Sequence, residues 1–147
     1  MSYVTNSDIE NRLGTSAYIQ LTDDAGTGSA DTTKVAEARD SSEAEVNSFL
    51  ATRYQTPIDT SAEPAVLAAI KSVVLDLVAY RLHGRRPPIP ADVVRRRSEA
   101  IAWLAQVALG ATQLPSVSAL TENTARGIVI ETAGPDRLMT RDSLGDL

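Results

Sequence analysis

The sequence predicts a mainly α-helical protein: a small bundle of about four helices over residues 1–110, followed by an extended C-terminal arm over residues 111–147 that contains a short β segment. Three observations predict this. Apolar residues recur at three- and four-residue spacing in long stretches, glycine or proline bounds most of these stretches, and the spacing is lost after Ala111. With 147 residues, 43% of them apolar, the chain can form one domain with a real core.

The first helix is expected in TNSDIENRLG. Thr5 or Asn6 can cap it, Asp8 and Glu10 favour its positive end, and Gly14 can adopt a left-handed stop. TSAYIQL can add another turn.

A second, amphipathic helix of about 20 residues follows a loop. Its apolar stripe is Val35, Ala38, Ser42, Val46, Phe49 and Leu50, and its other positions carry Glu37, Arg39, Asp40, Glu43 and Glu45.

The third helix, PAVLAAIKSVVLDLVAYRLHG, is apolar nearly all round, so we expect it at the centre of the core. The prolines of RRPPIP interrupt the chain, and Pro90 opens the fourth helix, ADVVRRRSEAIAWLAQVALG. Its predicted stripe is Val94, Ile101, Leu104 and Ala108, and Gly110 ends it.

The last segment contains apolar residues but no element long enough to form a core. Only GIVIET has the pattern of a strand, and it could add to an exposed sheet edge. We expect the apolar anchors of this arm to be buried against a neighbouring subunit or a partner.

The composition excludes several kinds of chemistry. The chain has no cysteine, so it contains no disulfide, thiolate metal site or cysteine nucleophile. No apolar run approaches the ~18 residues of a membrane span, and the start MSYVTNSD has no signal-peptide pattern. We therefore expect a soluble protein, made in the cytoplasm, with no membrane partner.

Charge is distributed unevenly along the chain. Residues 1–63 carry a net charge of −7, whereas residues 81–97, which we call the basic segment, carry +5. Two hypotheses follow. The arginines could meet the acidic half of the next subunit and help to close a ring, or they could bind nucleic acid. The residues concerned are Arg85, Arg86, Arg95, Arg96 and Arg97.

The loop LTDDAGTGSAD has the glycines and acids of a calcium or phosphate site. In an EF-hand register that starts at Asp23, however, Ala25 and Thr27 occupy ligand positions and Lys34 occupies the twelfth. The loop also lacks the GK[ST] of a P-loop. We interpret it as a turn that leads to a helix cap at Asp31 or Thr32, and we expect no metal or cofactor.

Neither His83 nor Asp76 belongs to a recognisable catalytic arrangement. His83, the only histidine, has arginines on both sides and no adjacent carboxylate to orient it, so we expect it near the last helix carbonyls. Asp76 lies in the most apolar helix and needs a partner, from Tyr80, Arg81, Arg53 or another helix. We expect no enzymatic activity; a small hydrolase is the least favoured alternative.

Six stretches in this order resemble the Mu-like prophage head–tail adaptor family of tailed phages. They are YVTNSDIENRLG, IQLTDDAGTG, EAEVNSFLATRYQTP, DLVAYRL, AIAWLAQVALG and RLMTRDSLGDL. Family members often carry more aspartates after LTD, where this chain has Ala25, Thr27 and Ser29, and this departure argues against a metal there.

The resemblance implies a structural role in the virion neck. Related connector proteins are small helical bundles arranged as a ring, commonly of twelve subunits. The ring docks on the portal and bridges it to a further neck or tail-completion protein. Genomic DNA passes through its lumen. We expect the arm to supply the partner-binding residues Ile128, Val129, Ile130, Leu138, Met139, Arg141 and Leu144. The alternative is a small DNA-binding regulatory protein that uses Arg85–Arg97.

Overall fold

The protein is mainly helical, as predicted. The computed structural model describes residues 2–59, 63–115 and 117, which contain five helices and no strand. The helices are α1 (Asn6–Leu13), α2 (Thr15–Thr22), α3 (Thr32–Leu50), α4 (Pro64–Gly84) and α5 (Ala91–Leu109). TSAYIQL therefore forms a separate short helix rather than one more turn. The predicted β segment, residues 127–132, lies outside the described residues.

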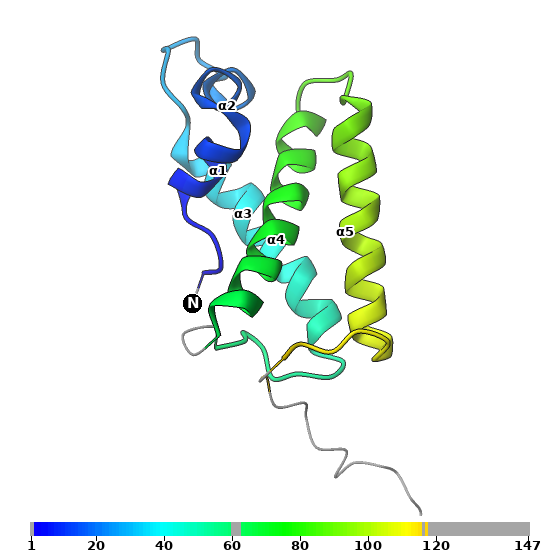
Figure 1. The fold of residues 1–147 in the computed structure, drawn as a ribbon. Coiled ribbons are helices and arrows are strands. Elements are labelled where there is room, and N and C mark those ends of the chain that lie inside the picture. The colour runs from blue at the N-terminus through cyan, green and yellow to red at the C-terminus, as the bar shows by residue number, and fades with distance from the viewer. Residues whose placement is uncertain (1, 60–62, 116, 118–147) are drawn as a thin grey trace, which may run out of the picture.

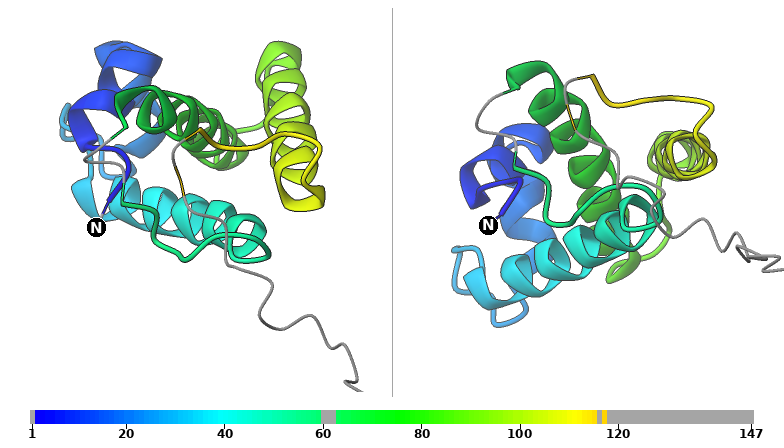
Figure 2. Two further views of the ribbon diagram at one scale, coloured as in Figure 1. Left: turned by 60° about the horizontal axis from the view of Figure 1, so that its bottom comes forward. Right: turned by 90° about the horizontal axis from the view of Figure 1, so that it is seen from below.

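Helix α4 is the central element. Figures 1 and 2 show it between the α1–α2 pair on one side and α5 on the other, with α3 crossing beneath. Its buried side chains lie on most of its circumference, as the sequence predicted: Val66, Ile70, Val73, Val74, Leu77, Val78, Ala79 and Leu82. Among the residues that the structure describes, no helix is long and apolar enough to cross a membrane.

The helix ends follow the local signals in the sequence. Thr5 caps α1 in a capping box with Asp8, and Asp31 caps α3 by accepting hydrogen bonds from the amides of Thr33 and Lys34. Gly110 ends α5 at φ +80°, a conformation that favours glycine, and the guanidinium of Arg53 covers it so closely that a Cβ would overlap it.

The buried stripe of α5 differs from the predicted one. Val93, Ala100, Leu104 and Val107 face the core, whereas Val94 is 46% exposed. Both stripes contain Leu104 and have helical spacing, so the sequence pattern does not separate them. The choice is made by packing, because α5 must contact α3 and α4 together.

Glu43 is the main polar correction to the sequence prediction. We placed it on the solvent side of α3, but only 9% of it is exposed. One carboxylate oxygen, Oε1, accepts hydrogen bonds from Ser2 Oγ (2.7 Å), the Tyr3 amide (2.8 Å) and the Val4 amide (3.2 Å). The first residues of the chain thereby satisfy the carboxylate and are fixed against α3.

Two tyrosine hydroxyls fasten the loops at the far end of α3. The Tyr3 hydroxyl donates to Asn47 Oδ1 (2.7 Å) and accepts from the Ile58 amide (2.9 Å), and burial raises the pKa of Tyr3. The Tyr54 hydroxyl accepts from the Leu114 amide (3.1 Å), and Leu114 belongs to the core. The first described residues after α5 thus pack on the bundle; the predicted domain boundary at residue 110 stays a prediction.

Two ion pairs join α1 to α4. Arg12 contacts the carboxylate of Asp76 at 2.5 Å, which supplies from another helix the partner that Asp76 was expected to need. Lys71 Nζ lies 2.6 Å from Asp8 Oδ1. The hydrogen bond from Lys71, with that from the Thr5 amide, lowers the pKa of Asp8 to about 2.

We predict that Glu43→Ala destabilises the protein by about 2–3 kcal/mol, because it leaves the buried amides of Tyr3 and Val4 without an acceptor. Glu43→Gln keeps an acceptor oxygen and should cost less. Urea unfolding followed by circular dichroism measures both. Equal losses for the two variants would show that the hydrogen bonds are not the cause.

We predict that Asp8→Asn lowers the free energy of unfolding by about 1 kcal/mol at neutral pH. Because folding lowers the pKa of Asp8 from 3.8 to about 2, its stabilisation is complete above pH 3.8 and is lost as the pH falls towards 2. Urea unfolding of both proteins over this range should show the difference shrinking. Asp40→Asn, at a carboxylate that is 67% exposed, is the control and should change little; a difference that persists near pH 2 would contradict the assignment.

Candidate interaction surface

The basic segment spans the end of α4, a proline-containing loop and the first half of α5. Figure 1 shows this loop at the same end of the bundle as α2 and the 23–31 loop. The fold therefore brings the most basic part of the sequence beside an acidic loop of the same chain, although 61 residues separate Asp24 from Arg85.

Arg85 and Arg86 hold the 23–31 loop. Arg85 donates to the Leu21 carbonyl (2.7 Å) and pairs with Asp24, while Arg86 donates to the Asp23 carbonyl (2.8 Å) and lies 3.6 Å from Asp24. Each guanidinium therefore contacts main-chain oxygen as well as carboxylate, an arrangement suited to the donor geometry of arginine.

The loop itself is organised by Asp23. Its carboxylate accepts from the amides of Thr27 (3.0 Å) and Gly28 (2.7 Å), and these hydrogen bonds lower the pKa of Asp23. Gly26 and Gly28 have φ of +69° and +76°, which explains the glycines of LTDDAGTGSAD. Within the described ranges, no group of three or more His, Cys, Asp or Glu side chains could hold a metal ion.

Glu45 occupies the junction of α3, α4 and α5. Its carboxylate lies 2.7 Å from Arg81 and 3.7 Å from Arg97, and the Arg97 guanidinium lies over the Tyr80 ring at 4.6 Å from its centroid. Arg97 therefore helps to join α5 to both neighbouring helices.

Among the described residues, Arg95 and Arg96 form ion pairs only within α5, with Glu99 (2.8 Å) and Asp92 (2.9 Å). Such exposed i,i+4 pairs contribute a few tenths of a kcal/mol each. With 63% of its side chain exposed, Arg95 is the most accessible of the five predicted arginines. All five have an acidic partner in their own chain, so whether they also contact another subunit stays a prediction.

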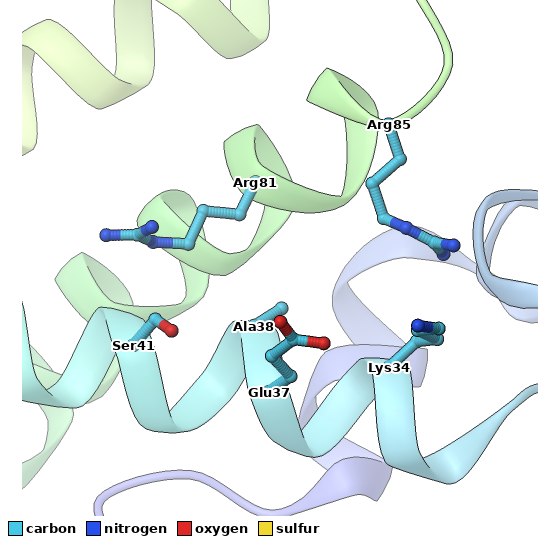
Figure 3. Close-up of a pocket in the computed structure, with 6 residues that line it drawn as sticks. All are labelled: Lys34, Glu37, Ala38, Ser41, Arg81 and Arg85. Carbon is cyan, nitrogen blue, oxygen red and sulfur yellow. The ribbon is translucent and has the colours of Figure 1, made fainter.

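An open pocket of about 370 Å³ lies between α3 and α4 (Figure 3). Four residues of α3, Lys34, Glu37, Ala38 and Ser41, face Arg81 of α4 and Arg85, which directly follows α4. Our sequence predictions named Arg85 as a site residue, but they named Lys34 only as a residue unsuited to a calcium loop and did not foresee the pocket. The available signal was Lys34 itself, because a cation in the first turn of a helix opposes the helix dipole.

His83 lies near the end of α4, as expected. Its Nδ1 is 2.8 Å from the Ala79 carbonyl of the same helix. A smaller pocket of about 210 Å³ brings His83 near Asp92, Arg12 and Arg96, and its described lining residues include no serine or threonine. The structure therefore brings a histidine and a carboxylate into one pocket without a hydroxyl nucleophile beside them.

The seven predicted partner-binding residues of the arm lie outside the described residues: Ile128, Val129, Ile130, Leu138, Met139, Arg141 and Leu144. The structure does not test their role.

The described residues thus form a small helical domain whose surface features are charged pockets and interhelical ion pairs. Residues 3–131 match the protein family described as Bacteriophage Mu, Gp36, so the chain belongs to this family. A search of curated proteins finds no match. The family membership makes this a Mu-like phage protein.

We predict that Arg85→Ala destabilises the domain by about 1 kcal/mol and loosens the 23–31 loop, because the loop loses a carboxylate contact and a carbonyl contact. Hydrogen exchange at Thr27 and Gly28 should become faster. Arg96→Ala is the matched control, since it removes an exposed pair elsewhere and should leave these amides unchanged. Equal exchange in wild type and Arg85→Ala would contradict the role assigned to Arg85.

Proposed function

We propose that the protein is a structural head–tail adaptor of a tailed-phage neck. In this proposal it forms a ring, dodecameric in our sequence-based expectation, that docks on the portal and bridges it to the next neck or tail component. Genomic DNA passes through the lumen without sequence-specific binding. The protein has no catalytic role and acts in the virion, after synthesis in the host cytoplasm.

The observation that carries this proposal is the match to the Bacteriophage Mu Gp36 family, which covers the helical domain and extends to residue 131. It therefore includes GIVIE, the part of the arm for which we predicted strand addition.

The distribution of charge on the domain favours the adaptor over the DNA-binding alternative. A nonspecific DNA-binding surface gains its affinity from cations that are free to meet phosphates. Here Arg85, Arg86 and Arg97 already contact carboxylates of the helical domain, and the whole chain has a net charge of −5.

The two ends of the domain also differ, which suits a bridging protein. The basic α4–α5 loop lies at one end, and Figure 1 shows the described residues after α5 at the other. A head-to-tail ring presents these ends to two different neighbours along its axis.

Electron microscopy of the full chain mixed with its portal tests the proposal. We expect a ring stacked coaxially on the portal. A variant that lacks residues 127–147 should keep its helical circular dichroism and lose docking, because the predicted apolar anchors are removed. Truncated protein that still docks would contradict the role of the arm, and full chain that never joins portals would contradict the adaptor proposal.

The DNA-binding alternative has its own measurement. The affinity of the free protein for duplex DNA is measured at several salt concentrations. An affinity that falls steeply with salt, with a slope that corresponds to several phosphate contacts, would favour the regulatory role. The triple variant Arg95→Glu, Arg96→Glu and Arg97→Glu then separates the roles: loss of ring assembly supports contacts between subunits, and unchanged assembly refutes them.

A further inference from the structure

The pocket between α3 and α4 places three cationic side chains around one opening. Lys34 comes from α3, Arg81 from the last turn of α4, and Arg85 from the position directly after that helix (Figure 3). This concentration of positive charge lies in a chain that is acidic overall. Arg81 and Arg85 have carboxylate partners in Glu45 and Asp24, so Lys34 is the cation whose position requires a reason.

The three cations differ in how they are paired. Arg81 pairs with Glu45, and Arg85 contacts Asp24 and the Leu21 carbonyl, so both guanidinium groups are held in place. The Lys34 ammonium has no ion pair or hydrogen bond within the part of the chain that the structure describes. The pocket thus combines fixed donors with one cation that has no described partner.

Lys34 also occupies an unfavourable position. It lies in the first turn of α3, where the positive end of the helix dipole disfavours a cation. The Asp31 carboxylate already caps the first amides of α3, so an anion in the pocket would act on Lys34 itself, by pairing with its ammonium. The Ser41 hydroxyl, one further donor on the same side of α3, has no hydrogen bond among the described residues.

Glu37 limits what the pocket can accept. Its carboxylate lines the pocket and forms no ion pair with the surrounding cations in the described structure. The negative charge of Glu37 therefore disfavours a ligand with several closely spaced negative charges more than a ligand with a single one.

We propose that this pocket binds a single carboxylate side chain from an acidic segment of a partner protein. The Lys34 ammonium and the Arg85 guanidinium, which lie at the same end of the pocket in Figure 3, hold the carboxylate. The inference deepens the proposed adaptor function by naming the chemistry of one partner contact, and it rests on that function for the existence of the partner.

The geometry favours a carboxylate over nucleic acid. A duplex carries closely spaced phosphates, and those adjacent to a bound one would approach Glu37, Asp24 and Glu45. A carboxylate is a single charge on a flexible side chain, which can enter a concave site and accept two hydrogen bonds from one arginine.

Six acids of the described helical domain are poor candidates for the occupant, because donors of their own chain already hold them: Asp8, Asp23, Asp24, Asp31, Glu43 and Glu45. The proposal therefore places the acidic segment on a different protein.

The test is a titration of the full-length, isotope-labelled protein with a short capped Gly-Ser peptide that carries two separated glutamates, followed by nuclear magnetic resonance. The same peptide with glutamines is the ligand control. We expect the glutamate peptide alone to shift the amide signals around Lys34 and Ser41. Equal shifts with both peptides, or shifts confined to other regions, would overturn the proposal.

Three variants test whether charge at the pocket controls binding of the glutamate peptide. Lys34→Gln should weaken binding of the glutamate peptide by about threefold to fivefold. Glu37→Gln should strengthen it by a similar factor, because a repelling charge is removed. Arg95→Gln, which removes one positive charge from the distant α5 surface, should leave it unchanged. An equal loss in Lys34→Gln and Arg95→Gln, or a loss in Glu37→Gln, would overturn the assignment.

A duplex DNA oligonucleotide provides the second arm of the titration. DNA that shifts the same signals, with an affinity reduced by Lys34→Gln, would replace the carboxylate with a phosphate as the ligand. Because these titrations use the isolated protein, their failure leaves the neck function to be decided by the portal experiment. Failure of portal docking with successful peptide binding would instead preserve the pocket and refute the adaptor function.

Discussion

The structure depends on one constraint: α4 is apolar over most of its circumference and must be covered on several sides. Helices α1 and α2 cover one side, while α3 and α5 cover the others. Four polar residues of α4 follow from this arrangement, because they reach towards a covering element. Asp76 and Lys71 pair with α1, Arg81 pairs with α3, and Tyr80 stacks with Arg97 of α5. Burial drives the packing, and these pairs restrict how each helix sits on the centre.

The charge asymmetry of the sequence is largely balanced inside the domain. Its acids and arginines lie far apart along the chain, yet Asp24 and Glu45 contact four arginines between them. A contact between subunits that uses the same arginines has to exchange or share these partners. Binding at the exposed Arg95 or at Lys34 does not disturb the pairs of Asp24 and Glu45, which makes these two residues the better positions for recognition by another molecule.

The sequence predicted the elements better than their faces. Glycine, proline and capping residues placed the helix ends well, since these signals act within one turn. Glu43 was placed off the apolar stripe by its spacing. Its partners, Ser2, Tyr3 and Val4, lie about forty residues away and have no local signature. Val94 was assigned to the core because two overlapping stripes share Leu104, and only the positions of α3 and α4 distinguish them.

The same limit applies to the candidate site. The basic segment is visible in the sequence, but its pairing with Asp24 and Glu45 depends on the packing of four helices. The pocket is formed by residues that lie far apart in the sequence and that no spacing rule connects. The one local signal was Lys34, a cation in the first turn of a helix.

The hydrogen bond from the Leu114 amide to Tyr54 has a mechanical consequence. Tyr54 lies just after α3, so the chain that leaves α5 is fastened to a second element before it continues. Arg53, the preceding residue, covers Gly110 at the end of α5. Val117 also packs against the core. Tension applied to the chain beyond residue 117 is therefore met first by Val117 and then by Leu114 and Tyr54, and it is shared between α3 and α5 instead of peeling α5 away from its last turn.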